Sequence, residues 1–345
     1  MGSALRDGMG AEPSEGCAPA RSHFFQRKQS KNRERAGANP SVWPTALLVC
    51  TTLLLGVSCK PISAEPAAPA QATPAEHIAN LTEARRGYVT HLTRHERLGE
   101  PAPAPPGFFH LVKYASSAGE LPAYVGVAPK GGRKHPAIIW IVGGFSNSIS
   151  DLAWTPDPPD NDQSATAFRE AGLVMMYPCL RGGNDAPGSM EGFYGEVDDV
   201  LAAADYLRKL DYVDPQRIYL GGHSTGGTLA LLAAESVNHF RAVFSFGPVE
   251  DVTGYGAKHL PFDLSIRREV MLREPGRYLR AIQTPTFVFE GAEGRSNIAS
   301  LRAMTKMPHS PAVRFYPIAG ADHFSTSNPP NASSPARFSP TPAPR

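Results

Sequence analysis

The stretch that most constrains the fold is residues 221–227, a glycine-rich turn between two apolar runs. It contains the pattern Gly-x-Ser-x-Gly as Gly222, Ser224 and Gly226. Residues 217–220 before it favour a strand, and residues 228–234 after it favour a helix. A strand, a sharp turn and a helix would lift the serine hydroxyl above the sheet, where flanking glycines leave room for neighbouring backbone. The pattern therefore predicts that Ser224 is a nucleophile, stabilised by the positive end of the helix that follows.

Apolar runs suited to strands recur on both sides of this turn. They cover residues 108–114, 121–128, 137–142, 173–177, 217–220, 242–246, 285–291 and 313–318. The first two runs are separated by a short polar turn and predict a hairpin. Residues 196–208 carry an apolar stripe at helical spacing. Strands that alternate with helices predict an α/β fold: a doubly wound, mostly parallel sheet of about eight strands with helices on both faces.

A histidine follows the last expected strand directly, at position 323. His239, His259 and His309 lack a strand-end loop that would place them over the sheet. The chain order of a serine, an acid and then a histidine is one in which a catalytic triad can be built. We therefore expect His323 to be the general base for Ser224.

The run at 137–142 ends in a glycine pair and a phenylalanine. Glycines after a buried strand let backbone N–H groups point into the space above the sheet. Together with the Thr225 N–H, an N–H from Gly144 or Phe145 is expected to form an oxyanion hole.

From residue 140 to residue 323 the sequence resembles the α/β-hydrolase superfamily. It is most similar to the catalytic domains of prolyl oligopeptidase-like and dienelactone hydrolase-like proteins. The resemblance rests on the turn around Ser224 and on three further motifs: Gly143-Gly144-Phe145, Arg181-Gly182-Gly183-Asn184 leading to residues 195–199, and Asp322-His323-Phe324. It implies a serine hydrolase with Ser224 as the nucleophile but says little about the substrate. A triad mechanism would need no metal or cofactor. The short lid favours an open site and therefore small esters or short acyl substrates.

The triad acid departs from that family. The resemblance implies an aspartate a few residues beyond the seventh strand, but Gly294 occupies this place. Glu290, at the strand end, is the preferred candidate, because its extra methylene lets it reach a histidine from further back. Glu293 and Asp251 remain the alternatives. The helix that normally follows the histidine is also absent from the sequence pattern.

The N-terminal region predicts export. Residues 21–35 carry six basic side chains against one acid, and residues 45–58 are uncharged and largely apolar. A basic segment before a short apolar run is typical of a signal peptide. Residues 55–59 resemble a bacterial lipoprotein cleavage box, in which Cys59 would carry lipid and attach the protein to a membrane. Ordinary secretion and a retained anchor are the alternatives.

These patterns divide the chain into four parts. Residues 1–59 form the basic extension and signal, and residues 60–107 form a tether rich in Pro and Ala with a helix expected over 77–98. Residues 108–325 form the catalytic domain, with a short lid over 254–283, and residues 326–345 form a tail expected to be disordered. His91 and His95 in the tether fit a solvated helix face better than a metal site.

The net charge and the cysteines indicate which partners and which covalent bonds to expect. The net charge of +2 gives no argument for a nucleic-acid partner. Cys179 would be the one cysteine left in the folded domain, so no internal disulfide is expected, and it is predicted to be a small buried residue.

Three functions fit the sequence. The leading hypothesis is an exported serine hydrolase, an esterase or a small-peptide peptidase. A non-catalytic envelope protein on a hydrolase fold would explain the unusual acid, and an acyltransferase would need an acceptor site that the pattern does not reveal.

Overall fold

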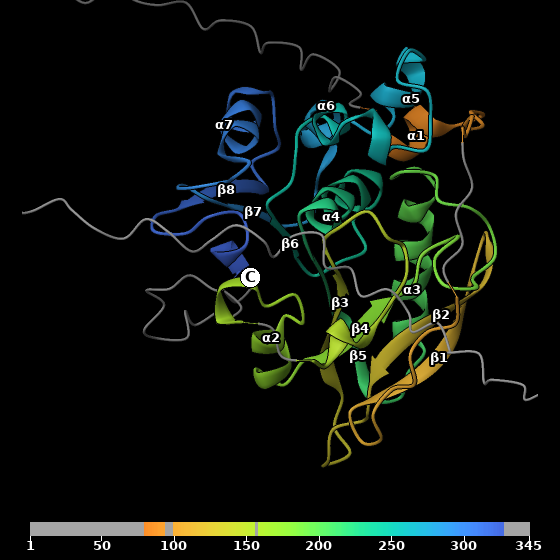
Figure 1. Cartoon of the computed structure of the whole chain (residues 1–345). Coiled ribbons are helices and arrows are strands. Elements are labelled where there is room, and N and C mark those ends of the chain that lie inside the picture. The colour runs from red at the N-terminus through yellow and green to blue at the C-terminus, as the bar shows by residue number, and fades with distance from the viewer. Residues whose placement is uncertain (1–78, 94–98, 156–157, 328–345) are drawn as a thin grey trace, which may run out of the picture. The chain divides into compact units, whose positions relative to one another are not determined.

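The computed structural model describes residues 79–93, 99–155 and 158–327 (Figure 1). The chain divides into two units, Met1–Ala72 and Thr73–Arg345, and all described residues belong to the second. The expected export signal, Cys59, His95 and the tail beyond residue 327 therefore lie outside the described residues. Among those described, no helix has the length and apolarity needed to cross a bilayer.

One sheet forms the centre of the described region. Its eight strands run in the order β1-β2-β4-β3-β5-β6-β7-β8. The hairpin of β1 and β2 pairs antiparallel with β4, and the remaining neighbours are parallel. This arrangement confirms the predicted α/β fold and mostly parallel sheet. The strands are β1 (Phe109–Ser116), β2 (Gly119–Gly126), β3 (His135–Ile141), β4 (Val174–Pro178), β5 (Val213–His223), β6 (Val243–Phe246), β7 (Thr286–Gly291) and β8 (Val313–Ile318).

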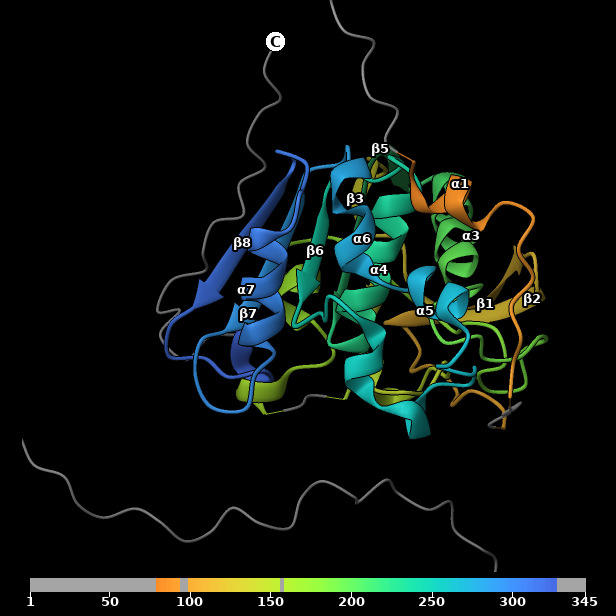
Figure 2. The same cartoon turned by 90° about the horizontal axis from the view of Figure 1, so that it is seen from above.

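Helices cover both faces of this sheet, as predicted. Figures 1 and 2 both show α3 next to α4, with α7 beside β7 and β8 at the other end of the sheet. Short 3-10 turns supplement the helices. The helices are α1 (Leu81–Arg85), α2 (Thr166–Glu170), α3 (Glu196–Arg208), α4 (Thr225–Ser236), α5 (Arg267–Met271), α6 (Pro275–Tyr278) and α7 (Ile298–Lys306).

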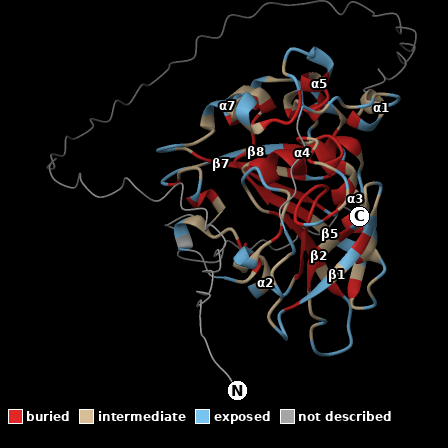
Figure 3. Cartoon of the chain, turned by 45° about the vertical axis from the view of Figure 1, so that its right-hand side comes forward, coloured by how far each residue is buried: buried red, intermediate tan, exposed pale blue. Residues whose placement is uncertain are grey.

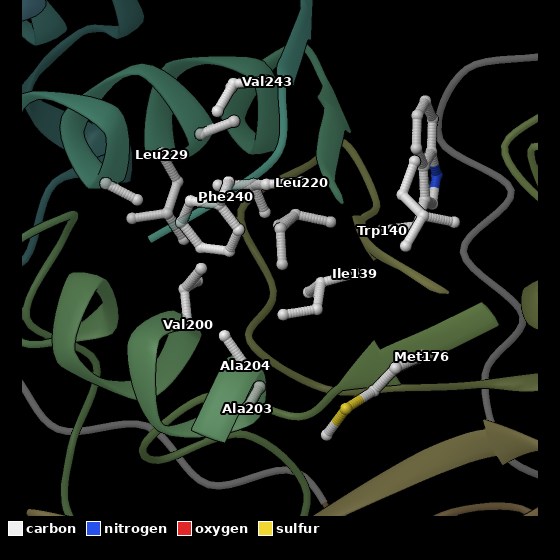
Figure 4. Close-up of a cluster of buried hydrophobic side chains, with 14 of the residues drawn as sticks. Ile139, Trp140, Met176, Val200, Ala203, Ala204, Leu220, Leu229, Phe240 and Val243 are labelled. Atoms are coloured by element: carbon white, nitrogen blue, oxygen red, sulfur yellow. The ribbon is translucent and has the colours of Figure 1, made fainter. Parts of the chain in front are cut away.

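The side chains of β3 point alternately to the two faces of the sheet, so they contribute to the core on both. Figure 4 shows Ile139 directed toward Leu220 and Leu229 on the α3 and α4 side, whereas Trp140 points the other way. The Trp140 ring packs against Phe168 of α2, with ring centroids 5.7 Å apart. Successive residues of a strand face opposite sides, so α2 covers the face opposite α4. Each fully buried side chain of this size contributes about 1.5–3 kcal/mol.

The helix α4 is enclosed rather than half-exposed. All its residues are buried, and Figure 3 shows it as the red centre of the molecule. It packs on β3, β5 and β6 below, while α1, α3 and α6 cover its other sides. A helix that is apolar and small on every side, as residues 225–236 are, requires such burial.

The helix expected over 77–98 is wrong for residues 86–93, the described part of it that follows α1. A capping box at Asn80 starts α1, which ends at Arg85. From there the chain is extended along the lid: the His91 N–H donates to Glu269 Oε1 at 2.5 Å, and the Thr93 N–H donates to the Pro261 carbonyl at 2.5 Å. These hydrogen bonds to a distant segment replace the intrahelical ones that local pattern predicted. His91 therefore lies on no helical face.

Candidate active site

Ser224 sits in the strained turn that the sequence predicts. It joins β5 to α4 with φ 56° and ψ −116°, a conformation that costs a non-glycine residue about 1–3 kcal/mol. Its backbone N–H donates to the Phe246 carbonyl on the neighbouring strand at 2.7 Å. A Cβ at Gly222 would lie 2.4 Å from the Gly226 carbonyl oxygen, so the close turn requires glycine there. The hydroxyl therefore stands above the carboxyl ends of the strands.

His323 lies between Ser224 and Glu290. Its Nε2 is 3.0 Å from Ser224 Oγ, and its Nδ1 is 3.2 Å from Glu290 Oε2. Glu290 is fully buried in β7, where its other carboxylate oxygen accepts the Gly291 N–H at 2.8 Å. A neutral imidazole that donates from Nδ1 to the carboxylate presents Nε2 as an acceptor for the serine proton.

The other carboxylates of these loops hold turns instead. Glu293 Oε1 accepts the Gly320 N–H at 3.0 Å, which ties β8 to the loop after β7. Asp251 accepts the Thr253 N–H at 2.8 Å and caps a short 3-10 turn. Asp322 accepts the N–H groups of Phe324 and Ser325, at 3.1 and 2.9 Å, and shapes the turn that carries His323. Of the three acids named from sequence, the structure brings Glu290 to the histidine.

Gly247, which the sequence analysis did not single out, makes this pairing sterically possible. It follows β6 with φ 64°, and a Cβ there would lie 2.6 Å from His323 Cε1 and 2.8 Å from Nδ1. The Asn297 side chain donates to the Gly247 carbonyl at 2.9 Å and holds the loop in place. The only signal in the sequence was a glycine directly after a buried strand. Many turns have such a glycine, so it did not distinguish Gly247.

A second histidine, His223, supports the loop of the first. It is 2% exposed, and burial lowers its pKa from 6.5 to about 4, so it is neutral near pH 7. Its Nε2 donates to the His323 carbonyl at 2.8 Å, which leaves Nδ1 to accept from Gln163 Nε2 at 3.0 Å. Gln163 also donates to Asn161 Oδ1 at 2.8 Å. Sequence reasoning missed this series of hydrogen bonds because it joins residues that lie far apart in sequence.

The expected oxyanion residues come together in two loops. Thr225 is the first residue of α4, so its N–H has no intrahelical acceptor. Its hydroxyl donates to the Gly144 carbonyl at 2.5 Å, which links the serine turn to the loop after β3. The Phe145 ring stacks on His259, with centroids 4.0 Å apart, and meets Tyr255 edge-on at 5.4 Å. His259 thus reaches the site from the lid, without the strand-end loop that the sequence analysis required.

Comparisons with known proteins agree with this fold. A sequence model of the prolyl oligopeptidase family matches residues 160–278. A puromycin-hydrolyzing peptidase of Mycobacterium tuberculosis superposes with a TM-score of 0.51 at 18% identity, covering 64% of this chain and 36% of that one. A second puromycin hydrolase structure gives 0.50 at 18% identity, with 66% and 38% covered. The chain has the α/β-hydrolase fold.

Two curated proteins match this chain over shorter stretches. The quorum-quenching protein AidA of Acinetobacter baumannii is 34% identical over 93 residues, which are 25% of this chain and 31% of that protein. Prolyl oligopeptidase A of Galerina marginata is 33% identical over 100 residues, 27% of this chain and 13% of that protein. The chain therefore spans less than a third of either curated relative.

A small cavity adjoins the loop that follows β3, which carries Gly144 and Phe145. Its volume is ≈ 40 Å³, and Phe145, Leu229 and Glu196 are among the residues that line it. Burial raises the pKa of the Glu196 carboxyl. Its Oε1 accepts three hydrogen bonds, from the Asn147 amide and from the N–H groups of Glu191 and Gly192, at 2.7–3.1 Å. Glu196 therefore organises the loop that forms one wall of the cavity.

The acids at the start of α3 form ion pairs, and Cys179 is buried, as the sequence predicted for the cysteine. Asp199 is buried and paired with Arg181 at 2.9 Å, and Asp198 pairs with Arg85 at 2.9 Å. Cys179 is buried, and burial raises the pKa of its thiol to about 12. Among the described residues, no group of three or more His, Cys, Asp or Glu side chains is placed to hold a metal ion.

Proposed function

We propose that this chain is a serine hydrolase that cleaves ester or peptide bonds through an acyl-enzyme. The observation that carries the proposal is the position of His323, with Nε2 at 3.0 Å from Ser224 Oγ and Nδ1 at 3.2 Å from a buried carboxylate. A serine in a strained turn needs a base to become nucleophilic, and a base needs a partner that fixes its tautomer. All three requirements meet at one edge of the sheet.

The mechanism follows from these positions. His323 Nε2 takes the proton of Ser224 as Oγ attacks the acyl carbon, and Glu290 stabilises the imidazolium. The Thr225 N–H, with an N–H from Gly144 or Phe145, stabilises the oxyanion. His323 then gives the proton to the leaving alcohol or amine, and the acyl group stays on Ser224. A water molecule, deprotonated by the same histidine, releases the acid and restores the serine.

The substrate class is proposed to be small esters and short acyl peptides. Two of the similar proteins are peptidases, and the family match covers the serine turn and most of the lid. The half-open cavity beside Thr225 has a volume of ≈ 40 Å³, a few times the space that one water requires, which suits a small acyl group. We therefore expect acetyl and similarly short acyl groups to be preferred to long ones.

Steady-state hydrolysis of p-nitrophenyl acetate, p-nitrophenyl octanoate and alanine p-nitroanilide tests this proposal. We expect kcat/KM to be at least about tenfold higher for the acetate than for the octanoate, because one excess methylene can already cost this much in a hydrophobic pocket. The Ser224→Ala variant should lose the activity. A well-folded chain that hydrolyses none of the three would instead be a non-catalytic protein. Faster product formation with an added alcohol, at unchanged acid release, would indicate an acyltransferase.

We also propose that the hydrolase acts in the cell envelope, attached through Cys59. This proposal rests on residues 1–59 alone. Expression of the full chain in a bacterial host, with detergent phase partitioning of wild type and Cys59→Ala, tests it. Lipidation predicts that the wild type enters the detergent phase and that the variant does not. Equal partitioning of the two would contradict attachment at this residue.

A further inference from the structure

Three phenylalanines among the described residues are exposed, and two of them stand beside the candidate triad. Phe145, 36% exposed, lies in the loop after β3, and Phe324, 40% exposed, follows His323 directly. The third, Phe108, is 55% exposed and precedes the edge strand β1. Apolar area that stays in water gains free energy when a ligand covers it. The two rings at the triad are therefore positions where a bound substrate is stabilised.

The Phe324 ring lies against both histidines of the site. Its centroid is 5.3 Å from that of His323, in an edge arrangement, and 6.2 Å from that of His223. The Phe324 N–H donates to Asp322 Oδ1 at 3.1 Å, within the turn that carries His323. This turn therefore places the phenyl ring beside the imidazole and leaves part of the ring open to water.

Phe145 belongs to a different part of the site. Its ring is stacked on His259, with centroids 4.0 Å apart, and it lines the cavity beside Thr225. Phe324 does not line that cavity. The acyl group proposed for the cavity would therefore meet Phe145, and Phe324 is left for another portion of the substrate.

The position of His323 decides which portion this is. When the tetrahedral intermediate collapses, the bond between the acyl carbon and the leaving oxygen or nitrogen breaks, and Nε2 gives its proton to the leaving atom. Such a transfer requires a heavy-atom separation of about 2.6–3.2 Å. The leaving atom therefore lies at the imidazole, and a group attached to it comes within reach of the Phe324 ring.

We propose that Phe324 is a specificity-determining residue that selects a leaving group with an aromatic ring. This inference rests on the proposed serine hydrolase function and defines its substrates further, as short acyl esters or amides of arylmethyl alcohols and amines. Offset or edge-on aromatic pairs are favourable beyond the apolar area that they bury, so an aromatic leaving group gains more than an alkyl group of the same size.

Steady-state hydrolysis of benzyl acetate, cyclohexylmethyl acetate and methyl acetate tests this selection. The three esters share the acyl group, and their alcohols are of similar acidity. We expect kcat/KM of the wild type to be at least about tenfold higher for the benzyl ester than for the methyl ester, and at least about twofold higher than for the cyclohexylmethyl ester. Equal values for the benzyl and cyclohexylmethyl esters would overturn the selection of an aromatic ring.

Variants assign the selection to the ring of Phe324. Phe324→Ala should lower the ratio of kcat/KM for benzyl over methyl acetate about tenfold, and Phe324→Trp, which keeps an aromatic ring, should retain the ratio. Phe108→Ala removes a more exposed phenyl group before β1 and is the matched control, with both rates expected to match the wild type. Circular dichroism verifies that each variant is folded.

The outcomes separate the inference from the function on which it rests. An equal loss with both esters in Phe324→Ala would mean that the ring only supports the turn of His323, and would refute the inference while the hydrolase function stands. A folded wild-type chain that hydrolyses none of the three esters would contradict the proposed function, and the inference would fall with it.

Discussion

Glu290 reaches His323 from within the last residues of β7. The family resemblance placed an aspartate further along, where Gly294 stands, but this position is not used. Glutamate has one more methylene than aspartate, so its carboxylate can extend to Nδ1 from the strand end, at 3.2 Å. Complete burial in the sheet fixes the side chain in one place. The replacement of aspartate by glutamate is therefore accompanied by a shift of the acid from position 294 back to the end of β7.

Replacing this acid gives the first prediction. Glu290→Gln should lower kcat for ester hydrolysis by about 10³–10⁴-fold, because an amide that donates to Nδ1 leaves His323 in the wrong tautomer. Glu293→Gln is the matched control, since Glu293 accepts a backbone N–H and makes no contact with the histidine. Steady-state kinetics of both variants measures the difference. Comparable losses in the two would remove Glu290 from the mechanism.

The second prediction concerns Gly247. Gly247→Ala should abolish most of the activity, because the added methyl group would lie 2.6 Å from His323 Cε1 and the residue already has φ 64°. Gly254→Ala, in the lid, offers the control, since a Cβ there meets nothing within 4 Å. Hydrolysis rates of the two variants, with circular dichroism to verify folding, provide the measurement. An active Gly247→Ala variant would show that the histidine loop can move aside without loss.

Among single residues, the sequence allowed those at strand ends to be predicted as members of the candidate site. Ser224, His323 and Glu290 could be proposed because their positions follow apolar runs. His223 could not, although it lies inside the glycine-rich motif, because its acceptor is the carbonyl of a residue 100 positions away. Gln163 could not either, since nothing local distinguishes a loop glutamine that supports a histidine from one exposed to water.

Among the elements, the lid depends on one buried cluster. Arg273 is 0% exposed and donates to Glu269 Oε2, to Thr90 Oγ1 and to the carbonyls of Glu191 and Gly192. Thr90 belongs to the extended segment after α1, and Glu269 belongs to α5. The cluster therefore holds three separate segments together, and it explains why the chain after Arg85 is extended rather than helical.

Breaking this cluster gives the third prediction. Arg273→Met should lower the free energy of unfolding by about 3–5 kcal/mol, because Glu269 would be left as a buried charge without its partner. Arg277→Met, which removes a partly exposed pair with Glu274, should cost about 1 kcal/mol or less. Urea unfolding of both variants gives the comparison. Equal costs would mean that the buried pair contributes no more than a surface one.

Element prediction from sequence failed where distant contacts decide. The helix expected over 77–98 had suitable local residues, yet its backbone bonds to the lid instead. The short helices α2 and α7 were not expected, because neither segment has apolar residues that repeat at helical spacing over a long stretch. In contrast, the predicted bounds of α3 match, since its apolar stripe faces the sheet along its full length.

Across the whole molecule, His223 links stability to pH. Burial lowers its pKa to about 4 from an ordinary 6.5, and the nearby His323 adds to the effect. The unfolded chain therefore takes up a proton at higher pH than the folded chain. Stability from this group is complete above pH 6.5 and is lost as pH falls toward 4, by about 3 kcal/mol in all.

The fourth prediction isolates this contribution. His223→Gln keeps a donor for the His323 carbonyl but does not titrate. The wild type should gain about 3 kcal/mol of unfolding free energy relative to this variant between pH 4 and pH 7. Urea unfolding of both proteins at several pH values measures the difference. A difference that stays constant with pH would mean that His223 accepts a proton in the folded state without penalty.

The most direct test of the account is covalent labelling with a fluorophosphonate, which reacts with activated serines. We predict that the wild-type chain is labelled at Ser224, as located by mass spectrometry, and that Ser224→Ala takes no label. His323→Ala should be labelled far more slowly, because the serine loses its base. A well-folded wild-type chain that takes no label, or a label that persists in Ser224→Ala, would contradict the proposed nucleophile.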